Sequence, residues 1–257
     1  MSGSFGLYSQ YYDLLYADKD YAGEVAYVLS LLGQHAQSKV TSLLELGCGT
    51  GIHAALIAKQ GLGVLGVDMS AEMLAEARTR ASAQGHLQKQ LSFEQGDARD
   101  FRANRRFDAV VSLFHVLSYQ SREVDLQAMM QTAASHLESG GIFVFDFWYG
   151  PAVLWQRPAV RMKRLANQEI TVERLAEPVV LDAENVVDVN YSVSIRNLKT
   201  NAIEQIKETH RMRYLFIPEI DKLLGENGFK RLRAEEWMTG RSPSVDSWGV
   251  CVVAAKH

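Results

Sequence analysis

The sequence predicts an α/β protein with a doubly wound, seven-stranded, mainly parallel sheet and an inserted antiparallel β-sheet. Between residues 42 and 147, short apolar runs alternate with segments whose apolar residues recur at helical spacing, which is typical of a parallel sheet covered by helices. From 158 to 215 a two-residue alternation predicts antiparallel strands with one apolar face. We therefore assign 1–154 and 216–257 to the core and 155–215 to an inserted subdomain over the active site.

The first half of the core is predicted from capping residues and apolar runs. Asp20 and Ser70 are suited to begin helices, at 20–37 and 71–83. A third helix is expected at 52–59, directly after a glycine-rich turn. Apolar runs of strand length predict buried strands at 42–44, 63–68, 91–95 and 107–114.

The second half is predicted in the same way. A helix over 122–136 is expected to stop at Gly140 and Gly141, before a fifth strand at 142–147. Residues 197–201 are expected to form a hairpin tip within the insertion. Pro218 begins a helix that Gly228 ends, and two strands follow at 229–237 and 248–254.

The composition is that of an ordinary globular protein, with 257 residues, 47% hydrophobic residues and a net charge of −3. A slightly acidic chain has no bulk basic field for nucleic acid, and no apolar run reaches the length of a membrane span. The two cysteines lie far apart and provide no disulfide or metal framework. We expect a cytoplasmic protein with a small-molecule substrate and no nucleic-acid or membrane partner; a homodimer is left open.

The turn Glu45–Gly51 joins a predicted strand to a predicted helix and has the pattern Gly-x-Gly-x-Gly. A dinucleotide fingerprint would need a small residue where Ile52 stands, and the Gly-Lys-Ser/Thr of a phosphate-binding loop is absent. Glu45 would repel a pyrophosphate. S-adenosylmethionine (SAM) carries a sulfonium and an ammonium but no phosphate, so this turn favours SAM.

Two further acids follow predicted strands. Asp68 lies about twenty residues after the turn, the spacing at which an acid accepts hydrogen bonds from ribose hydroxyls. Asp97, in Gly96-Asp97-Ala98, follows the third strand and is expected to accept from the exocyclic amine of an adenine; the alternative is a turn-forming residue.

Four side chains are candidates for removing a proton from an acceptor: Tyr119, His115, His210 and Tyr11. His115 has the alternative of a structural, hydrogen-bonded histidine, and His210 that of a surface residue. Tyr11 lies in an aromatic N-terminal segment that is either a cover over the ligand or a helix packed on the domain. No cluster of His, Cys and Asp has metal-ligand spacing, so we expect no metal. Cys48 is expected to fill space rather than act as a nucleophile.

A basic run and an aromatic pair flank the start of the insertion. Arg157, Arg161, Lys163 and Arg164 form either a solvated strand face or a clamp for a diphosphate. Trp148 and Tyr149 either stack on a sugar or nucleobase or close the core beneath the insertion.

The glycine turn, the acid after the second strand and Gly96-Asp97-Ala98 together resemble the class I SAM-dependent methyltransferases, over roughly 40–150 and 216–255. The resemblance implies a Rossmann-like methyltransferase fold. It also implies these cofactor-binding residues: Glu45, Gly47, Cys48 and Gly49 at the methionine end, Asp68 at the ribose, Asp97, Ala98 and Met69 at the adenine, and Tyr11 and Phe114 lining the cofactor.

A closer resemblance is to the deoxyaminosugar N-methyltransferases, which act on amino groups of nucleotide-linked sugars. It is carried by Tyr11-Tyr12-Asp13, the segment 114–119, Phe147-Trp148-Tyr149 and the insertion. It implies that Tyr119 lies beside the substrate amine, that Trp148 and Tyr149 contact the substrate, and that Arg241 lies in a nearby loop. The alternatives are N- or O-methylation of another small metabolite, a non-catalytic nucleotide-binding module, and a dinucleotide-dependent oxidoreductase, against which Ile52 argues.

Overall fold

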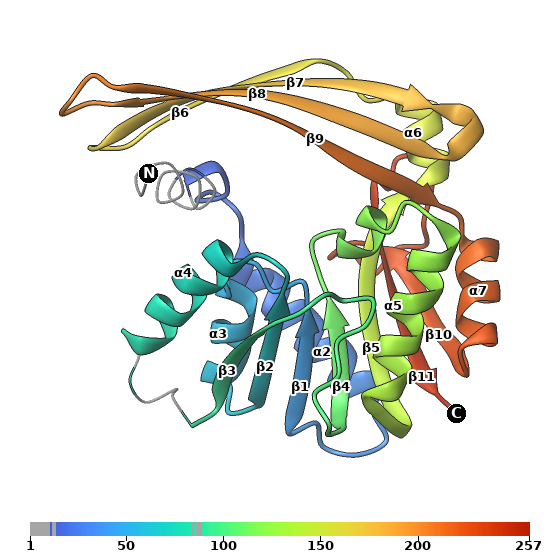
Figure 1. The fold of residues 1–257 in the computed structure, drawn as a ribbon. Coiled ribbons are helices and arrows are strands. Elements are labelled where there is room, and N and C mark those ends of the chain that lie inside the picture. Colours follow the sequence, from blue (N-terminus) through green and yellow to red (C-terminus); the bar gives the residue numbers. More distant parts are fainter. Residues whose placement is uncertain (1–10, 12–13, 84, 86–88) are drawn as a thin grey trace.

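The computed structural model describes residues 11, 14–83, 85 and 89–257, and its core is a mainly parallel sheet (Figure 1). Five strands pair in parallel in the order β3-β2-β1-β4-β5. Two later strands extend the sheet beyond β5, β11 antiparallel to β5 and β10 antiparallel to β11. The bounds are β1 Ser42–Leu46, β2 Gly63–Asp68, β3 Leu91–Gln95, β4 Phe107–Ser112, β5 Leu137–Tyr149, β10 Phe229–Glu236 and β11 Gly249–Lys256.

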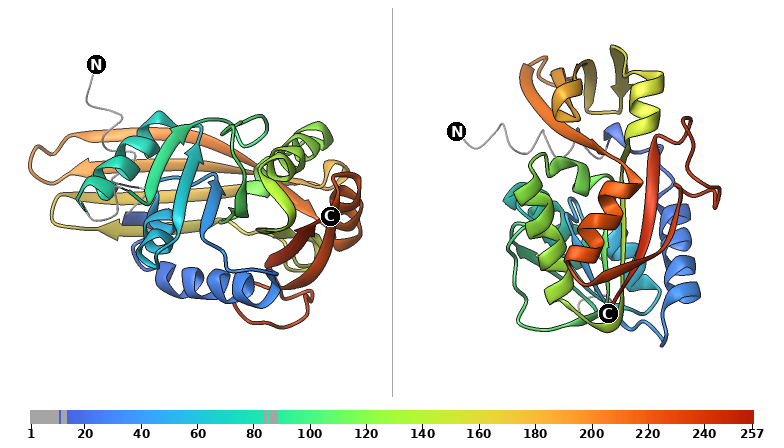
Figure 2. Two further views of the ribbon diagram at one scale, coloured as in Figure 1. Left: turned by 90° about the horizontal axis from the view of Figure 1, so that it is seen from below. Right: turned by 90° about the vertical axis from the view of Figure 1, so that its right-hand side faces the viewer.

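Helices cover both faces of this sheet because successive strand residues point to opposite sides. Leu43, on one face, packs with α2 (Tyr21–His35), α3 (Ile52–Lys59) and α4 (Ala71–Ser82). Leu44, on the other face, packs with α5 (Glu123–Ser135) and α7 (Ile217–Glu226). Helices α2 and α5, one from each set, lie on opposite sides of the sheet in Figure 2. The predicted doubly wound fold is confirmed.

The insertion is a sheet of four long antiparallel strands that crosses above the carboxyl ends of the core strands (Figures 1 and 2). Its last strand also pairs with the end of β5, where Trp148 aligns with Tyr214, so core and insertion are hydrogen-bonded into one sheet. The strands are β6 Arg161–Ala166, β7 Ile170–Leu181, β8 Val186–Asn197 and β9 Ile203–Leu215. The boundaries predicted for the inserted subdomain stay a prediction.

Several predicted boundaries are wrong, each for a local reason. Strand β4 ends at Ser112, because Phe114 and His115 adopt positive φ. Gly140 and Gly141 do not stop a helix; α5 ends at Ser135, and both glycines lie within β5. The β4–β5 register shifts there, and Gly140, with φ of +81°, permits the irregularity.

Two short helices of the core were not predicted, η2 (Val116–Tyr119) and α6 (Gly150–Gln156). Both follow the carboxyl ends of core strands, at the side of the sheet that faces the insertion. Within the described part of the chain, no helix is long and apolar enough to cross a membrane.

Candidate active site

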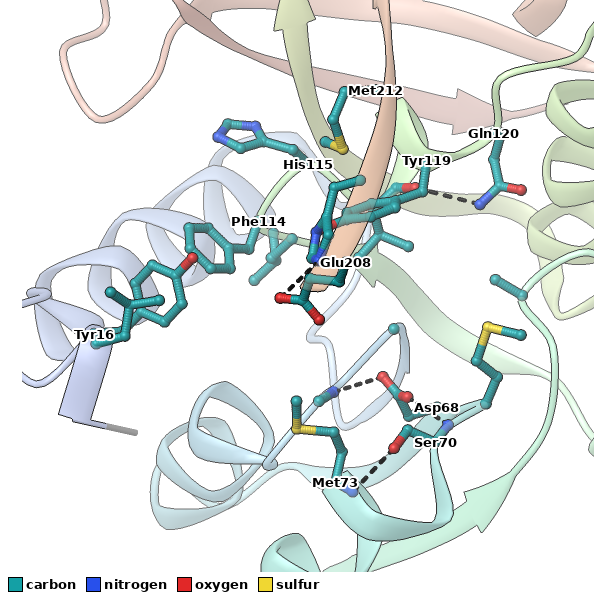
Figure 3. Close-up of a pocket in the computed structure, with 18 of the residues that line it drawn as sticks. Tyr16, Asp68, Ser70, Met73, Phe114, His115, Tyr119, Gln120, Glu208 and Met212 are labelled. Atoms are coloured by element: carbon teal, nitrogen blue, oxygen red, sulfur yellow. Dashed lines mark hydrogen bonds and ion pairs between the residues drawn. The ribbon is translucent and has the colours of Figure 1, made fainter. Parts of the chain in front are cut away.

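A cavity of about 680 Å³ lies between the carboxyl ends of the core strands and the inner face of the insertion. Its lining comes from the glycine turn and the loops after β2 and β3, from the segment between β4 and α5, and from β7, β8 and β9. In Figure 3, Asp68, Ser70 and Met73 lie on one side of the space, and Tyr119, Glu208 and Met212 on the other. The cavity thus joins core and inserted residues that are remote in sequence.

The glycine turn leaves open backbone at the cavity. Gly47 and Gly49 both have left-handed φ, +78° and +53°. A Cβ atom on Gly47 would lie 2.5 Å from Val116 Cγ2, whereas one on Gly49 would meet no heavy atom within 4 Å. Gly47 is therefore needed for packing, while Gly49 leaves space that a ligand lying against the backbone could fill. That SAM occupies this space stays a prediction.

The carboxylate of Asp68 is fixed by two backbone donors at the edge of the cavity. Asp68 Oδ2 accepts from Gly49 N and Oδ1 from Ser70 N, both at 2.9 Å. A carboxylate has about four acceptor positions, so each oxygen keeps capacity for a further donor. Asp68 is therefore placed to accept from two ligand hydroxyls. The neighbouring Met69 also lines the cavity and is 66% exposed.

Asp97 and Ala98 line the cavity, but the carboxylate of Asp97 already has a charged partner. Arg99 donates to both oxygens of Asp97, with its Nη2 at 2.5 Å from Oδ2, and reaches Asp125 at 3.1 Å. These hydrogen bonds lower the pKa of Asp97. The adenine role of Asp97 stays a prediction.

Glu45 and Cys48 lie beneath the turn and do not line the cavity. Glu45 is buried, 3.7 Å from His53 Nδ1, and its Oε2 has no hydrogen-bond partner among the described residues. Burial, and next the charge of Asp68, raise the pKa of Glu45 to about 8. Burial raises the pKa of the Cys48 thiol well above its usual value, so this cysteine suits a packing role. The roles of Glu45 and Cys48 at the methionine end of the cofactor stay a prediction.

Phe114 and His115 form a strained turn after β4, with φ of +67° and +64°. Non-glycine residues in this region cluster at functional sites, where surrounding structure holds them. The buried carboxylate of Asp146 accepts from His115 N at 3.0 Å and lies 2.6 Å from His115 Nδ1. Sequence reasoning missed Asp146; the available signal was an isolated acid in the apolar run of β5.

Tyr119, on η2, contacts His210 of β9 across the cavity, and His210 in turn contacts Glu208 of the same strand. Tyr119 Oη lies 2.7 Å from His210 Nδ1, and His210 Nε2 lies 3.3 Å from Glu208 Oε1. All three residues line the cavity. Sequence reasoning missed Glu208, although the two-residue alternation of β9 places it on the same face as His210.

Tyr11 lines the cavity and is buried. It packs with Leu15 against Ile170 and Val172 of the insertion. Burial raises the pKa of Tyr11 to about 12, so its phenol stays protonated and can donate a hydrogen bond but does not act as a base near neutral pH. Tyr12 and Asp13, which carried part of the family resemblance, lie outside the described residues.

Of the three residues predicted to bind the substrate, Trp148 lines a cavity, whereas Tyr149 and Arg241 do not. Trp148 lines the main cavity and also an adjoining cavity of about 580 Å³. Tyr149 packs beside Phe147 and lines neither cavity. Arg241 also lies outside both linings and pairs with Glu236 at 2.9 Å. Among the residues that the structure describes, no group of three or more His, Cys, Asp or Glu side chains could hold a metal ion.

Comparisons with known proteins agree with this fold. Residues 43–141 match the family model described as a methyltransferase domain. A curated relative, dTDP-3-amino-3,4,6-trideoxy-alpha-D-glucopyranose N,N-dimethyltransferase of Streptomyces venezuelae, is 37% identical over 142 residues, which are 54% of this chain and 56% of the relative. The chain spans about half the length of the first curated relatives it matches.

Two solved structures resemble the whole chain. The crystal structure of Streptomyces venezuelae DesVI has a TM-score of 0.78 and 26% identity, over 96% of this chain and 97% of that chain. SAM-bound CalS10, an amino pentose methyltransferase from Micromonospora echinaspora, has a TM-score of 0.74 and 23% identity, over 98% and 97%, a likeness of fold. Residues 43–141 therefore match a methyltransferase domain, within a chain that has the class I SAM-dependent methyltransferase fold and is similar to the aminosugar N-methyltransferases.

Proposed function

We propose that the chain is a SAM-dependent methyltransferase that methylates the amino group of a nucleotide-linked deoxyaminosugar. One observation carries this proposal: a single cavity joins the glycine turn and Asp68 to Tyr119, His210 and Glu208. The names of the curated relatives supply the acceptor class, because several are N,N-dimethyltransferases of dTDP-linked aminosugars.

SAM, when bound, supplies an activated methyl group on a positively charged sulfur. The open backbone of Gly49 and the carboxylate of Asp68 would hold it, with Met69 and Ala98 near its adenine. Methyl transfer is an in-line displacement, so the chain's main task is to position the acceptor nitrogen against the methyl and to exclude water. The insertion suits that task because it covers the cavity.

The charge of the main cavity supports an amine as the acceptor. Its lining contains the carboxylates of Asp68 and Glu208, that of Asp97, which is paired with Arg99, and, among the described residues, one guanidinium, that of Arg174. A net excess of carboxylates attracts a protonated amine and the sulfonium of SAM. A neutral hydroxyl acceptor gains nothing from this field.

The adjoining cavity has the opposite charge and supports an anionic group at the other end of the acceptor. Arg161, Lys163 and Arg174 contribute to its lining, and no described acidic residue does. The two cavities share Arg174 and three aromatic residues, Trp148, Tyr191 and Trp248. An acceptor with an amine at one end and a diphosphate at the other would match both, because arginine and lysine bind phosphate oxygens strongly.

The predicted basic run is therefore divided between two roles. Arg161 and Lys163 line the adjoining cavity, whereas Arg157 and Arg164 pair with Asp182 and Glu173, at 2.6 and 2.8 Å. Arg157 and Arg164 therefore form a solvated face, which was the alternative given for this basic run in the sequence analysis. We propose that Arg161 meets the diphosphate, with Lys163 beside it; Lys163 Nζ also donates to Leu15 O at 2.8 Å.

Two measurements test the proposed function. Calorimetry with SAM, S-adenosylhomocysteine and NAD should show binding of the first two in preference to NAD, and Asp68→Ala should weaken SAM binding by about 1–3 kcal/mol. Preference for NAD would contradict the cofactor assignment.

The second measurement is an acceptor screen with isotopically labelled SAM, read by mass spectrometry. It should compare dTDP-linked aminosugars, the same sugars without the nucleotide, and dTDP-linked sugars that carry a hydroxyl in place of the amine. Methylation of the first group above the other two is expected. Equal methylation of the amine and hydroxyl sugars would contradict the amine assignment.

A further inference from the structure

Three polar side chains, Tyr119, His210 and Glu208, follow one another across the cavity. Tyr119 comes from the core, whereas His210 and Glu208 come from β9 of the insertion. The hydrogen bond of 2.7 Å between Tyr119 Oη and His210 Nδ1 joins residues 91 positions apart in the chain. His210 Nε2 then lies 3.3 Å from Glu208 Oε1. A hydroxyl, an imidazole and a carboxylate in this order are the arrangement that activates a hydroxyl in nucleophilic enzymes.

The carboxylate determines which imidazole nitrogen carries the proton. A carboxylate 3.3 Å from Nε2 favours the neutral tautomer that carries its proton on Nε2, because a carboxylate stabilises a donor that faces it. Nδ1 is then an acceptor, and Tyr119 O–H donates to it. This leaves the oxygen of Tyr119 with lone pairs that can accept a hydrogen bond from an ammonium in the cavity.

Charged and titratable groups from β7, β8, β9 and the N-terminal segment surround His210. Tyr191, on β8, lies edge-on to the imidazole at 5.0 Å, and the guanidinium of Arg174, on β7, lies over the Tyr191 ring at 4.6 Å. Tyr11, from the N-terminal segment, is electrostatically coupled to both Glu208 and Arg174. Glu208 is the acid nearest to the imidazole and the one that holds its orientation.

The other imidazole of the cavity lacks such an arrangement. His115 has an acid partner, Asp146, but makes no hydrogen bond with a hydroxyl among the described residues. Its backbone is fixed in a left-handed conformation by the same acid. We assign His115 and Asp146 to shaping the turn after β4.

We infer that Tyr119, His210 and Glu208 form a proton relay that deprotonates the bound ammonium of the acceptor so that it can accept the methyl group. This inference rests on the proposed function. The ammonium proton first passes to Tyr119 Oη while the phenolic proton passes to His210 Nδ1, and the resulting imidazolium is paired with Glu208. The freed nitrogen lone pair then forms a bond to the methyl carbon, and the carbon–sulfur bond breaks with its electron pair remaining on sulfur, which becomes neutral.

The relay gives the insertion a chemical role besides covering the cavity. Of the three relay residues, only Tyr119 belongs to the core. The relay therefore forms only when β9 of the insertion lies over η2. The contact between these two elements and the pairing of β9 with β5 hold that arrangement.

The test compares His210→Gln, Glu208→Gln and Tyr119→Phe with Thr209→Ala, all assayed with SAM and a dTDP-linked 3-aminosugar. Thr209 is a matched control because it is exposed on the opposite face of β9, where it donates to Asn190. Thermal unfolding and SAM calorimetry first establish that each variant folds and keeps the cofactor site.

We expect His210→Gln and Tyr119→Phe to lower kcat by about 100-fold, the usual contribution of a general base, with little change in the acceptor KM. Without the relay, reaction requires acceptor that has already lost its proton, so the lower-pH limb of the kcat/KM profile should move toward the pKa of the free amine. Glu208→Gln should move this limb of the profile in the same direction but by a smaller amount, and Thr209→Ala should leave the limb unchanged. The double variant of Tyr119 and His210 should be no slower than either single variant, because both remove one unit.

Two outcomes would overturn the relay. One is a uniform loss of rate with an unmoved pH profile, and the other is a loss in KM alone. A wild-type enzyme that binds SAM but methylates no amine would instead overturn the proposed function, so the two failures are distinguishable. If one variant does not fold, the pH profile of either remaining variant tests whether the relay removes the proton.

Discussion

The buried carboxylate of Asp146 holds His115 by two atoms, the backbone nitrogen at 3.0 Å and the imidazole Nδ1 at 2.6 Å. Both contacts act on a turn whose two residues have positive φ, a conformation unfavourable for non-glycine residues. A buried acid thus maintains strained backbone at the wall of the cavity. The position of Phe114, which lines the cavity with His115, depends on the same contact.

Asp146→Ala should lower the free energy of unfolding by about 1–3 kcal/mol, because the His115 N–H loses its partner in a buried site. It should also reduce methyl transfer, since the turn can then relax. Urea unfolding and turnover of the folded variant measure both effects. Asp108→Ala is the control, because Asp108 similarly accepts from Thr41 N and Ser42 N but lies outside the cavity lining. Equal loss of turnover in both variants would contradict a role for Asp146 at the cavity.

Gly49→Ala should abolish most SAM binding while the chain still folds. Its φ of +53° predicts a backbone cost of roughly 1–2 kcal/mol, and the new methyl group would project into the space proposed for the ligand. Gly61→Ala is a matched control, with φ of +93°, no heavy atom within 4 Å of its Cβ position, and a site away from the cavity. Calorimetry with SAM should separate the two variants. Retained binding in Gly49→Ala would show that the cofactor does not approach this glycine.

The raised pKa of Glu45 predicts a specific dependence of stability on pH. The carboxyl titrates near 4.5 in the unfolded chain and near 8 in the folded one, so between these values the folded chain holds a proton that the unfolded chain has released. The contribution of Glu45 to stability therefore falls as the pH rises through this window. Glu45→Gln cannot ionise, so its free energy of unfolding should increase relative to the wild type from pH 4.5 toward 8. Urea unfolding of both proteins across that range provides the measurement, and a constant difference would refute the assignment.

Arg161→Ala should raise the KM for a dTDP-linked aminosugar by about tenfold or more, the effect of losing a hydrogen bond to a charged group. The KM for the same sugar without its nucleotide should change little, because only the diphosphate is proposed to reach Arg161. Arg164→Ala removes an arginine from the same strand that pairs with Glu173 outside this cavity and should leave both values unchanged. Steady-state kinetics with the two acceptors test this. Parallel increases for both acceptors would contradict the diphosphate assignment.

The amino-acid sequence alone determined the core sheet and the turn at its centre. Strands buried on both faces must be apolar, and helices that cover them must carry periodic apolar residues. The turn after β1 needs glycine because its backbone has left-handed φ. Each of these features is therefore visible in the local sequence pattern. The same is true of Asp68, because its place at the end of β2 brings it to the glycine turn.

Only the tertiary structure decided which polar side chains meet. The relay from Tyr119 to His210 depends on β9 pairing with β5 and passing over η2, a long-range arrangement that no local pattern encodes. The burial of Glu45 beneath its own turn, where a contact with the ligand was expected, likewise follows from the packing of α2 and α3 around it. Local propensity determines the elements, whereas the chemistry of this cavity arises where separately determined elements are brought into contact.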